Sequence, residues 1–326
     1  DRWIILIAYV IGVSLGVHLL NLLCIPAIAL VFYYRKFSNP TAKGSLLTIL
    51  ISFVIIVLVL YGLEPGFVEM GQYFDLFFVN TLGMSFNSGV IFYVVLLLAA
   101  LAWNIWELYS GKSDTRIKVS FAVAIALSGI LLLGENRLIP LVLIIALLVY
   151  LFKFCNRVPK RVFTNISLSI LVIFIGFGCY GLILIRSNAH TPLDENSPSN
   201  TFALAKYLSR EQYGETPLLY GRTYKSDIMR KADKNGVWSP AVDEGRMQYA
   251  EEVKTDPSQP DHYKELGPKQ TYLFSPEQNM VFPRIHDEKH ASEYEQWLGL
   301  VGEQVQATTR LDENGNPIKG IPRHPI

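Results

Sequence analysis

Two polar side chains stand inside an uncharged, apolar stretch near the start of the chain. Residues 3–34 contain no Asp, Glu, Lys or Arg, but they include His18 and Asn21. A histidine in lipid is expensive, whereas one at the mouth of a helix pair, facing a wet cavity, is not. An imidazole there could bind an anionic lipid phosphate or a metal ion, or contact an attacking hydroxyl. The alternative is a structural histidine bonded to a neighbouring backbone carbonyl.

Two arginines are further candidates for binding an anionic group. Arg186 ends the last long apolar run, and a guanidinium at the level of lipid headgroups suits bidentate recognition of a phosphate. Arg137 follows Glu135 in a short polar connection and is a parallel candidate. Both have structural alternatives, since Arg186 could be a snorkelling anchor and Arg137 could simply pair with Glu135.

No other motif in the chain indicates chemistry strongly. His286 and His290 have the i, i+4 spacing of a zinc helix, but the glutamate is misplaced and no further ligand is evident, so we predict no metal site. Asn87, Ser88 and Gly89 begin an apolar run and are typical of a helix N-cap. Phosphate-binding loops and dinucleotide fingerprints are missing, and the polar tail has no basic stripe, so nucleic acid is not an expected partner.

The elements that must position these side chains are apolar helices. The opening stretch would be about 48 Å long as one helix, beyond a hydrocarbon core of roughly 30 Å. We therefore predict helices over 3–17 and 24–34 with a turn at 18–21, although one tilted helix is the alternative. Seven membrane spans in an all-α bundle follow if each later uncharged run also crosses, namely 44–63, 76–106, 119–134, 138–152 and 162–185.

Basic residues predict the orientation. They gather in three connections, which contain Arg35, Lys36 and Lys43, then Lys112, Arg116 and Lys118, and finally Lys153, Arg157, Lys160 and Arg161. Short basic connections stay in the cytoplasm, so everything after Arg186 is expected outside. The outer connection at 64–86 interleaves aromatic and polar residues, which is typical either of a helix lying in the membrane interface or of a helix capping the bundle.

The composition changes after Arg186, and we predict two domains, a transmembrane domain over 1–186 and an extracytoplasmic region over 187–326. The second has a linker at 187–200, helical patterns at 201–213 and 292–305, and strand candidates at 218–220 and 270–274. Its apolar content is low, so we expect a small α+β or irregular region that is incomplete on its own.

Two runs carry a family resemblance. Residues 9–28 (YVIGVSLGVHLLNLLCIPAI) and 185–196 (IRSNAHTPLDEN), together with 202–220, resemble a family of Gram-negative bacterial membrane proteins of unknown function. That family is related to transmembrane protein O-mannosyltransferases of the GT-C glycosyltransferase superfamily. The resemblance implies a multi-pass protein of the bacterial inner membrane with a periplasmic C-terminal region. Its reaction would transfer a sugar, with mannose favoured, from a polyprenyl-phosphate carrier to a protein hydroxyl.

The resemblance also assigns roles to individual residues. In related enzymes a basic or polar residue lies near the donor phosphate, and the resemblance implies that His18 has this role, with Asn21 beside it. Arg186 is implied as a second phosphate contact. The acidic catalytic residue is expected in an outer loop upstream of Asp1, so Glu64, Glu69, Asp75 and Glu135 are not assigned as the base, and this stretch alone is expected to be inactive. The implied partners are membrane lipid, the lipid-linked sugar and a protein acceptor, and a divalent metal is left open. The alternatives are a non-enzymatic carrier for a solute or lipid-linked sugar, or a ligase or polymerase of lipid-linked glycans.

Overall fold

A computed structural model of the chain describes residues 2–111, 113–134, 138–155, 157–189, 191–211, 217, 219–232, 236, 238–256, 258–299, 310–311 and 317–318. The chain forms two compact units, one made of residues 1–212 with 247–267 and the other of 213–246 with 268–326. The boundary predicted after residue 186 separates a membrane part from an extracytoplasmic part, whereas these units are defined by compactness. The predicted boundary therefore stays a prediction.

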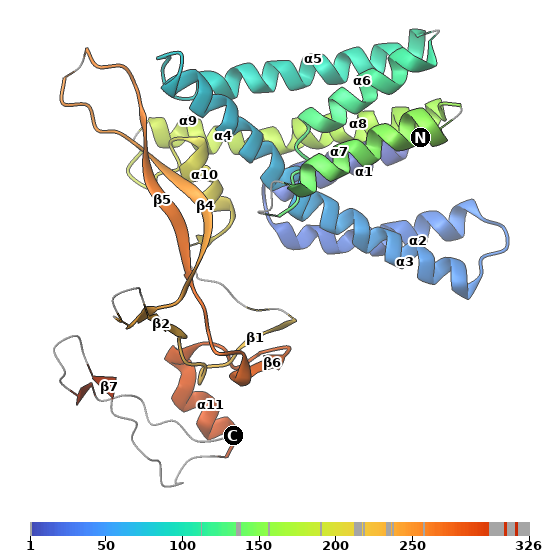
Figure 1. Cartoon of the computed structure of the whole chain (residues 1–326). Helices are drawn as coiled ribbons and strands as arrows, with labels where there is room; N and C mark the ends of the chain where they lie inside the picture. Colours follow the sequence, from blue (N-terminus) through green and yellow to red (C-terminus); the bar gives the residue numbers. More distant parts are fainter. Residues whose placement is uncertain are drawn as a thin grey trace. The chain divides into compact units, whose positions relative to one another are not determined.

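The opening stretch forms two helices, as the hairpin interpretation predicts. Helix α1 covers Arg2–Leu15, the short 3₁₀ helix η1 covers Leu19–Leu23, and α2 covers Cys24–Lys36. The chain reverses direction at η1 (Figure 1). A single tilted helix is therefore not what the chain forms, and the predicted turn at residues 18–21 lies inside the observed break.

A long, irregular helix follows. It consists of α3 (Ala42–Val57), the π-helical segment η2 (Leu58–Leu63) and α4 (Glu64–Asn80). The irregularity has a cause in the sequence, because Pro65 has no N–H to give to the preceding turn. Helix α4 packs along α5 and turns Val68, Asp75 and Val79 inward. Of the two interpretations of 64–86, a helix packed against the bundle is the one observed.

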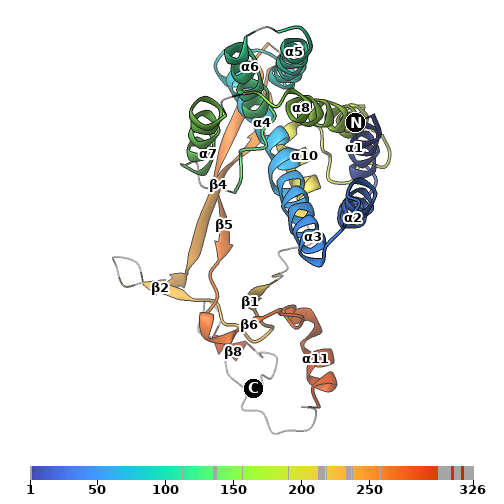
Figure 2. The ribbon, with the colours of Figure 1, turned by 90° about the vertical axis from the view of Figure 1, so that its right-hand side faces the viewer.

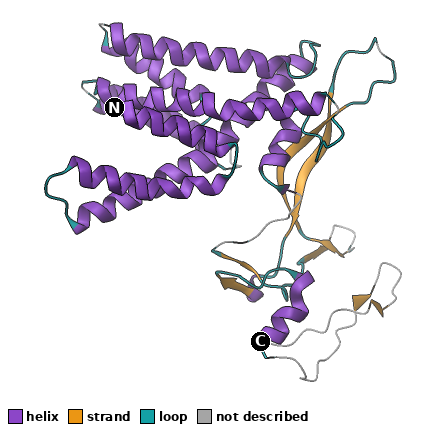
Figure 3. Cartoon of the chain, turned by 180° about the vertical axis from the view of Figure 1, so that it is seen from behind, coloured by secondary structure: helices purple, strands orange, loops and turns teal. Residues whose placement is uncertain are grey.

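The remaining helices complete a bundle in the first unit. They are α5 (Ser88–Ser110), α6 (Asp114–Leu127), α7 (Leu138–Val149) with the π-helical segment η3 (Tyr150–Phe154), α8 (Lys160–Phe177), the 3₁₀ helix η4 (Gly178–Tyr180) and α9 (Gly181–Asn188). Figure 2 looks along several of these helices and shows the order α8, α1, α2, α3. The connections after α2, α5 and η3 lie at the end where the chain begins, and η1 lies at the opposite end (Figures 1 and 3). The three basic connections therefore share one end of the bundle.

Four helices among the described residues are long and apolar enough to cross a membrane, so the prediction of seven is not supported. They are Leu19–Lys36, Ala42–Asn80, Ser88–Ser110 and Lys160–Asn188. The reason is length: a span needs about 20 residues, whereas α1 and α6 have 14 residues each. The run 119–134 is cut short because the backbone turns at Gly129, where φ is +77°.

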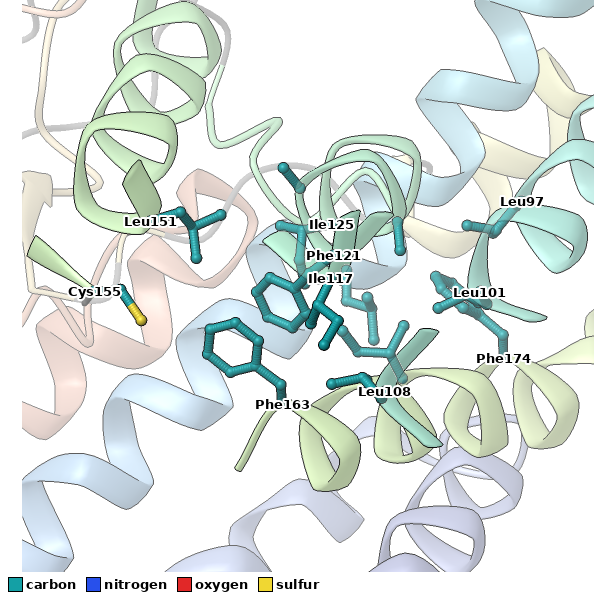
Figure 4. Close-up of a cluster of buried hydrophobic side chains, with 14 of the residues drawn as sticks. Leu97, Leu101, Leu108, Ile117, Phe121, Ile125, Leu151, Cys155, Phe163 and Phe174 are labelled. Carbon is teal, nitrogen blue, oxygen red and sulfur yellow. The ribbon is translucent and has the colours of Figure 1, made fainter. Parts of the chain in front are cut away.

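The centre of the bundle is a cluster of buried apolar side chains from α5, α6, η3 and α8 (Figure 4). Phe121 and Phe163 stack with their ring centroids 4.2 Å apart. A small polar network crosses the same region, because Asn104 donates to Ser120 Oγ at 3.0 Å and accepts from Ser167 Oγ at 2.6 Å. Since all three polar residues are buried, the network fixes the relative register of α5, α6 and α8.

Outside the bundle the chain is mixed, as predicted for an α+β region. Helix α10 covers Thr201–Leu208, and a hairpin of β4 (Val242–Glu251) and β5 (Tyr263–Tyr272) has its tip in the first unit. In the second unit the structure describes short antiparallel strand pairs and three short helices. These are β1 (Tyr220–Arg222) with β6 (Asn279–Val281), β2 (Arg230–Ala232) with β3 (Trp238–Pro240), β7 (Arg310–Leu311) with β8 (Pro317–Ile318), the 3₁₀ helices η6 (Pro276–Gln278) and η7 (Glu288–His290), and α11 (Ala291–Trp297).

Candidate functional site

His18 lies at the turn between α1 and η1, with its side chain exposed. It occupies the N-cap position of η1, where Nδ1 accepts a 3.1 Å hydrogen bond from the backbone N–H of Leu20. Because Nδ1 is the acceptor, Nε2 carries the proton and is available as a donor. Asn21, also exposed, donates to the carbonyl of Ser14 at 3.2 Å and so closes the turn. The imidazole therefore presents an N–H at the tip of the helix pair, and its bond among the described residues is to the Leu20 N–H rather than to a neighbouring carbonyl.

Arg186 lies near the end of α9 and is exposed. Among the described residues its side chain makes no hydrogen bond or ion pair. The Tyr180 hydroxyl donates to the carbonyl of Leu15 at 2.9 Å, which ties η4 to the end of α1. Since Arg186 is six residues beyond Tyr180, about 9 Å along a helix, and His18 is three residues beyond Leu15, both side chains belong to the same end of the bundle. Arg137, the parallel candidate, falls outside the described residues.

Glu64 is a third polar group at this end. It stands 22 residues after the start of α3, a rise of about 33 Å, which is close to the thickness of a hydrocarbon core. The residue is only 7% exposed, and its buried Oε2 atom has no hydrogen-bond partner in the part of the chain that the structure describes. The Tyr180 hydroxyl interacts electrostatically with Glu64, Tyr207 and Arg210. A carboxylate, two phenols and a guanidinium thus gather beside the ends of α1 and η4.

Sequence reasoning did not find this cluster. Tyr207 and Arg210 come from α10 and the turn after it, more than a hundred residues beyond Glu64, and no local pattern links the two segments. A signal for Glu64 did exist: its carboxylate precedes Pro65 in the middle of what proves to be one continuous helix. An ionisable residue at a helix irregularity near a membrane is a functional candidate in its own right.

A second polar cluster fixes the hairpin tip to the bundle. Asp75 is fully buried and accepts hydrogen bonds from the backbone N–H groups of Asn87 at 3.1 Å and Gly89 at 3.0 Å and from the Tyr263 hydroxyl at 2.7 Å. Burial and the neighbouring Asp75 charge raise the pKa of Tyr263 well above its usual range, so the phenol stays a donor. Asn87 precedes α5 as predicted, but its side chain makes no capping bond, and Asp75 supplies the cap instead.

Further contacts hold the same hairpin tip. Asn80 exchanges two hydrogen bonds with the backbone of Tyr263, one from the Tyr263 N–H at 2.8 Å and one to its carbonyl at 2.9 Å. Asp261 accepts from the backbone N–H of Phe86 at 3.1 Å and forms a 2.7 Å ion pair with Lys254. The side chains of Asp75, Asn80, Asp261 and Tyr263 all have partners in the protein, so we regard this second cluster as a structural clamp rather than a binding site.

Metal ligation is not evident in the structure. Among the described residues no group of three or more His, Cys, Asp or Glu side chains could hold a metal ion. His290 Nδ1 lies 2.8 Å from Glu293 Oε2, and His286 does not join them in a ligand set.

Two models of known families match parts of the chain. Residues 1–41 match the model of a family described as the protein O-mannosyl-transferase TMEM260 N-terminal domain. Residues 214–314 match a family of unknown function, DUF8416. Neither the curated proteins nor the solved structures contain a match to the chain. The first matched segment spans α1, η1 and α2, and with them His18 and Asn21, so the similarity to the protein O-mannosyltransferase model concerns this part of the chain. The run 185–196 lies outside both matches.

Proposed function

We propose that this chain supplies the donor-binding end of a membrane glycosyltransferase. The reaction transfers a sugar, with mannose favoured, from a polyprenyl-phosphate carrier to a hydroxyl group of a protein. The observation that carries the proposal is the pair of exposed donors, His18 and Arg186, at the same end of a bundle whose first helices match a protein O-mannosyltransferase model.

The chemistry of the transfer explains why those two groups are needed. When the sugar leaves its carrier, negative charge develops on the lipid phosphate, and donors already in place lower the barrier to that step. The Nε2–H group of His18 supplies one hydrogen bond, and the fork of Arg186 supplies two parallel ones. Asn21 holds the His18 turn through its bond to Ser14. The base that deprotonates the acceptor is not assigned to a residue of this chain.

The distribution of charge supports an orientation for the bundle. The basic connections share one end, and such connections are retained in the cytoplasm. With that end inside, His18, Arg186 and the region after residue 187 lie on the periplasmic side of the bacterial inner membrane. The carrier would then present its phosphate and sugar at the outer boundary, where the protein acceptor is also available.

A transfer assay tests the proposal. The intact natural protein is reconstituted in liposomes with polyprenyl-phosphate mannose labelled in the sugar, and serine- and threonine-containing peptides are added outside. We expect label on a peptide hydroxyl, released by β-elimination. Movement of the labelled carrier or of a solute across the bilayer without transfer would instead make the protein a carrier. Label found only in longer lipid-linked glycans would make it a glycan ligase or polymerase.

A further inference from the structure

Two of the basic connections are fastened to each other at one end of the bundle. Lys118, on α6, donates from Nζ to the carbonyl of Cys155 at 2.6 Å, and Lys160, at the start of α8, donates to the carbonyl of Gly111 at 3.1 Å. The first bond reaches the connection after η3, and the second reaches the connection after α5. The cations of both connections therefore belong to one surface.

That surface has exposed cations without a described carboxylate partner. Lys153, Arg157 and Lys160 are exposed, and none of the three forms an ion pair with a residue that the structure describes. We call these three residues the basic surface. Residues 150–162 contain no Asp or Glu, so this segment does not neutralise its own charge. An anion from outside the chain is attracted to such a surface.

The acidic residues of the neighbouring connection are engaged elsewhere. Glu107 pairs with Arg116 and accepts a 3.3 Å hydrogen bond from Trp103 Nε1. Asp114 stands in the first turn of α6, where a carboxylate stabilises the N-terminus of a helix. The basic surface therefore keeps its positive charge.

An apolar helix leads directly to the basic surface. Helix α7 has no buried residue, and with η3 it forms an apolar helix over Leu138–Phe154. Lys153 lies in the last turn of η3, between Phe152 and Phe154, which are 50% and 68% exposed. Aromatic and basic residues at the end of an apolar helix are typical of the level of lipid headgroups. A lipid matches both features, whereas free phosphate or nucleic acid would leave the apolar helix uncovered.

We propose that the basic surface binds the headgroup of an anionic phospholipid whose acyl chains lie along α7. Basic pockets between membrane helices are known to bind such headgroups. The phosphodiester accepts hydrogen bonds from Lys153 and from the fork of Arg157, and Lys160 adds charge while its Nζ holds the Gly111 carbonyl. The partner is a constituent of the membrane and not the sugar donor, so the inference does not depend on sugar transfer. In the proposed orientation the bound lipid belongs to the inner leaflet.

A lipid titration of the intact protein tests the proposal. The protein in detergent is titrated with phosphatidylglycerol, which has a net negative charge, and with zwitterionic phosphatidylcholine, and bound lipid is counted by native mass spectrometry. We expect phosphatidylglycerol to bind more tightly. The double variant Lys153→Gln, Arg157→Gln should bind it about 25-fold more weakly, since each cation at an anionic membrane surface contributes about a factor of five.

A second double variant is the matched control. Arg230→Gln, Lys231→Gln removes two exposed cations from β2, in the second unit. Because the loss of charge is the same and the basic surface is intact, this control should bind both lipids as the wild type does.

The other outcomes overturn the inference. Equal binding of the two lipids by the wild type would exclude a site for anionic lipid, and an unchanged preference in the Lys153, Arg157 variant would place it elsewhere. An equal loss in the control would reduce the effect to net charge. Displacement of phosphatidylglycerol by an equal concentration of inorganic phosphate would make this a site for free anions. Should the double variant not fold, Lys153→Gln and Arg157→Gln are compared singly, and each should weaken binding about fivefold.

Discussion

The hydroxyl group of Tyr263 donates a 2.7 Å hydrogen bond to the buried carboxylate of Asp75, which stands 188 positions earlier in the chain. The same carboxylate caps the start of α5 through the N–H groups of Asn87 and Gly89. One side chain therefore joins the end of a bundle helix, the start of the next and the tip of the β4–β5 hairpin. The hairpin tip is part of the bundle's compact unit because of these contacts.

Removing this hydroxyl should loosen the hairpin tip. Tyr263→Phe leaves the ring in place but takes one of three donors from a buried carboxylate, a loss of about 1–3 kcal/mol. We expect faster amide hydrogen exchange across residues 247–267, with exchange in α8 unchanged. Tyr272→Phe, on the same strand and 54% exposed, is the control and should behave as the wild type. Unchanged protection of the tip in Tyr263→Phe would mean that the contacts of this ring with Phe86 and Phe202 are enough to hold it.

Acid should loosen the same tip through Asp261. Burial alone would raise the pKa of this carboxyl, but hydrogen bonds from Lys254 and the Phe86 N–H, with the charge of Lys254, bring the pKa below its usual range. A depressed folded-state pKa gives stability that is present above the unfolded value of about 3.9 and is lost as the pH falls through the folded value. Limited proteolysis of the hairpin between pH 2 and 6 should therefore show increasing cleavage at the acid end.

Asp261→Asn should remove that dependence. The variant keeps the size of the side chain but loses the charge, so its hairpin should be cleaved more readily at neutral pH and change less on acidification. Asp243→Asn, an exposed change on β4, should follow the wild-type profile. An acid profile of Asp261→Asn identical to that of the wild type would assign the transition to other carboxylates.

The contact between α1 and α8 should control the distance between the two proposed phosphate donors. A Cβ on Gly176 would lie 2.5 Å from the backbone nitrogen of Val13, whereas one on Gly178 meets no atom within 4 Å. Gly176→Ala should push the helices apart, with an overpacking penalty of about 1–3 kcal/mol, and should weaken binding of polyprenyl phosphate. Gly178→Ala should leave stability and binding unchanged. Equal binding of polyprenyl phosphate by the two variants would show that the distance between α1 and α8 does not determine the geometry of the phosphate site.

The opening helix pair was predictable from sequence because the residues that interrupt the helix are close together in the sequence. His18 and Asn21 interrupt an uncharged run between Gly16 and Pro26, and the structure has a turn and a 3₁₀ helix there. The basic connections were likewise predictable, since the charged residues of each one lie between two apolar runs. What failed was the count of spans, because an apolar run does not reveal where a helix ends: the run 119–134 stops being helical at Leu127.

The polar clusters could not be predicted because their members are distant in sequence. Asp75 and Tyr263 belong to segments with no common pattern, and so do Glu64 and Arg210. Their pairing depends on how α10 and the hairpin fold back on the bundle, which neither periodicity nor spacing encodes. Sequence did identify His18 and Arg186 as candidates, since a polar residue inside or at the end of an apolar run stands out by itself.

The central claim is that the outer end of the bundle binds an anionic lipid head through His18 and Arg186. Binding of polyprenyl phosphate to the intact protein in nanodiscs, compared among wild type, His18→Ala and Arg186→Ala, tests it most directly. We expect each substitution to weaken binding by tenfold or more, since bonds to charged groups contribute about 1.5–3 kcal/mol. Stability should be unchanged in Arg186→Ala, whose side chain is exposed, and about 1 kcal/mol lower in His18→Ala, which loses the cap bond from Leu20. Wild-type affinity in both variants would contradict the claim.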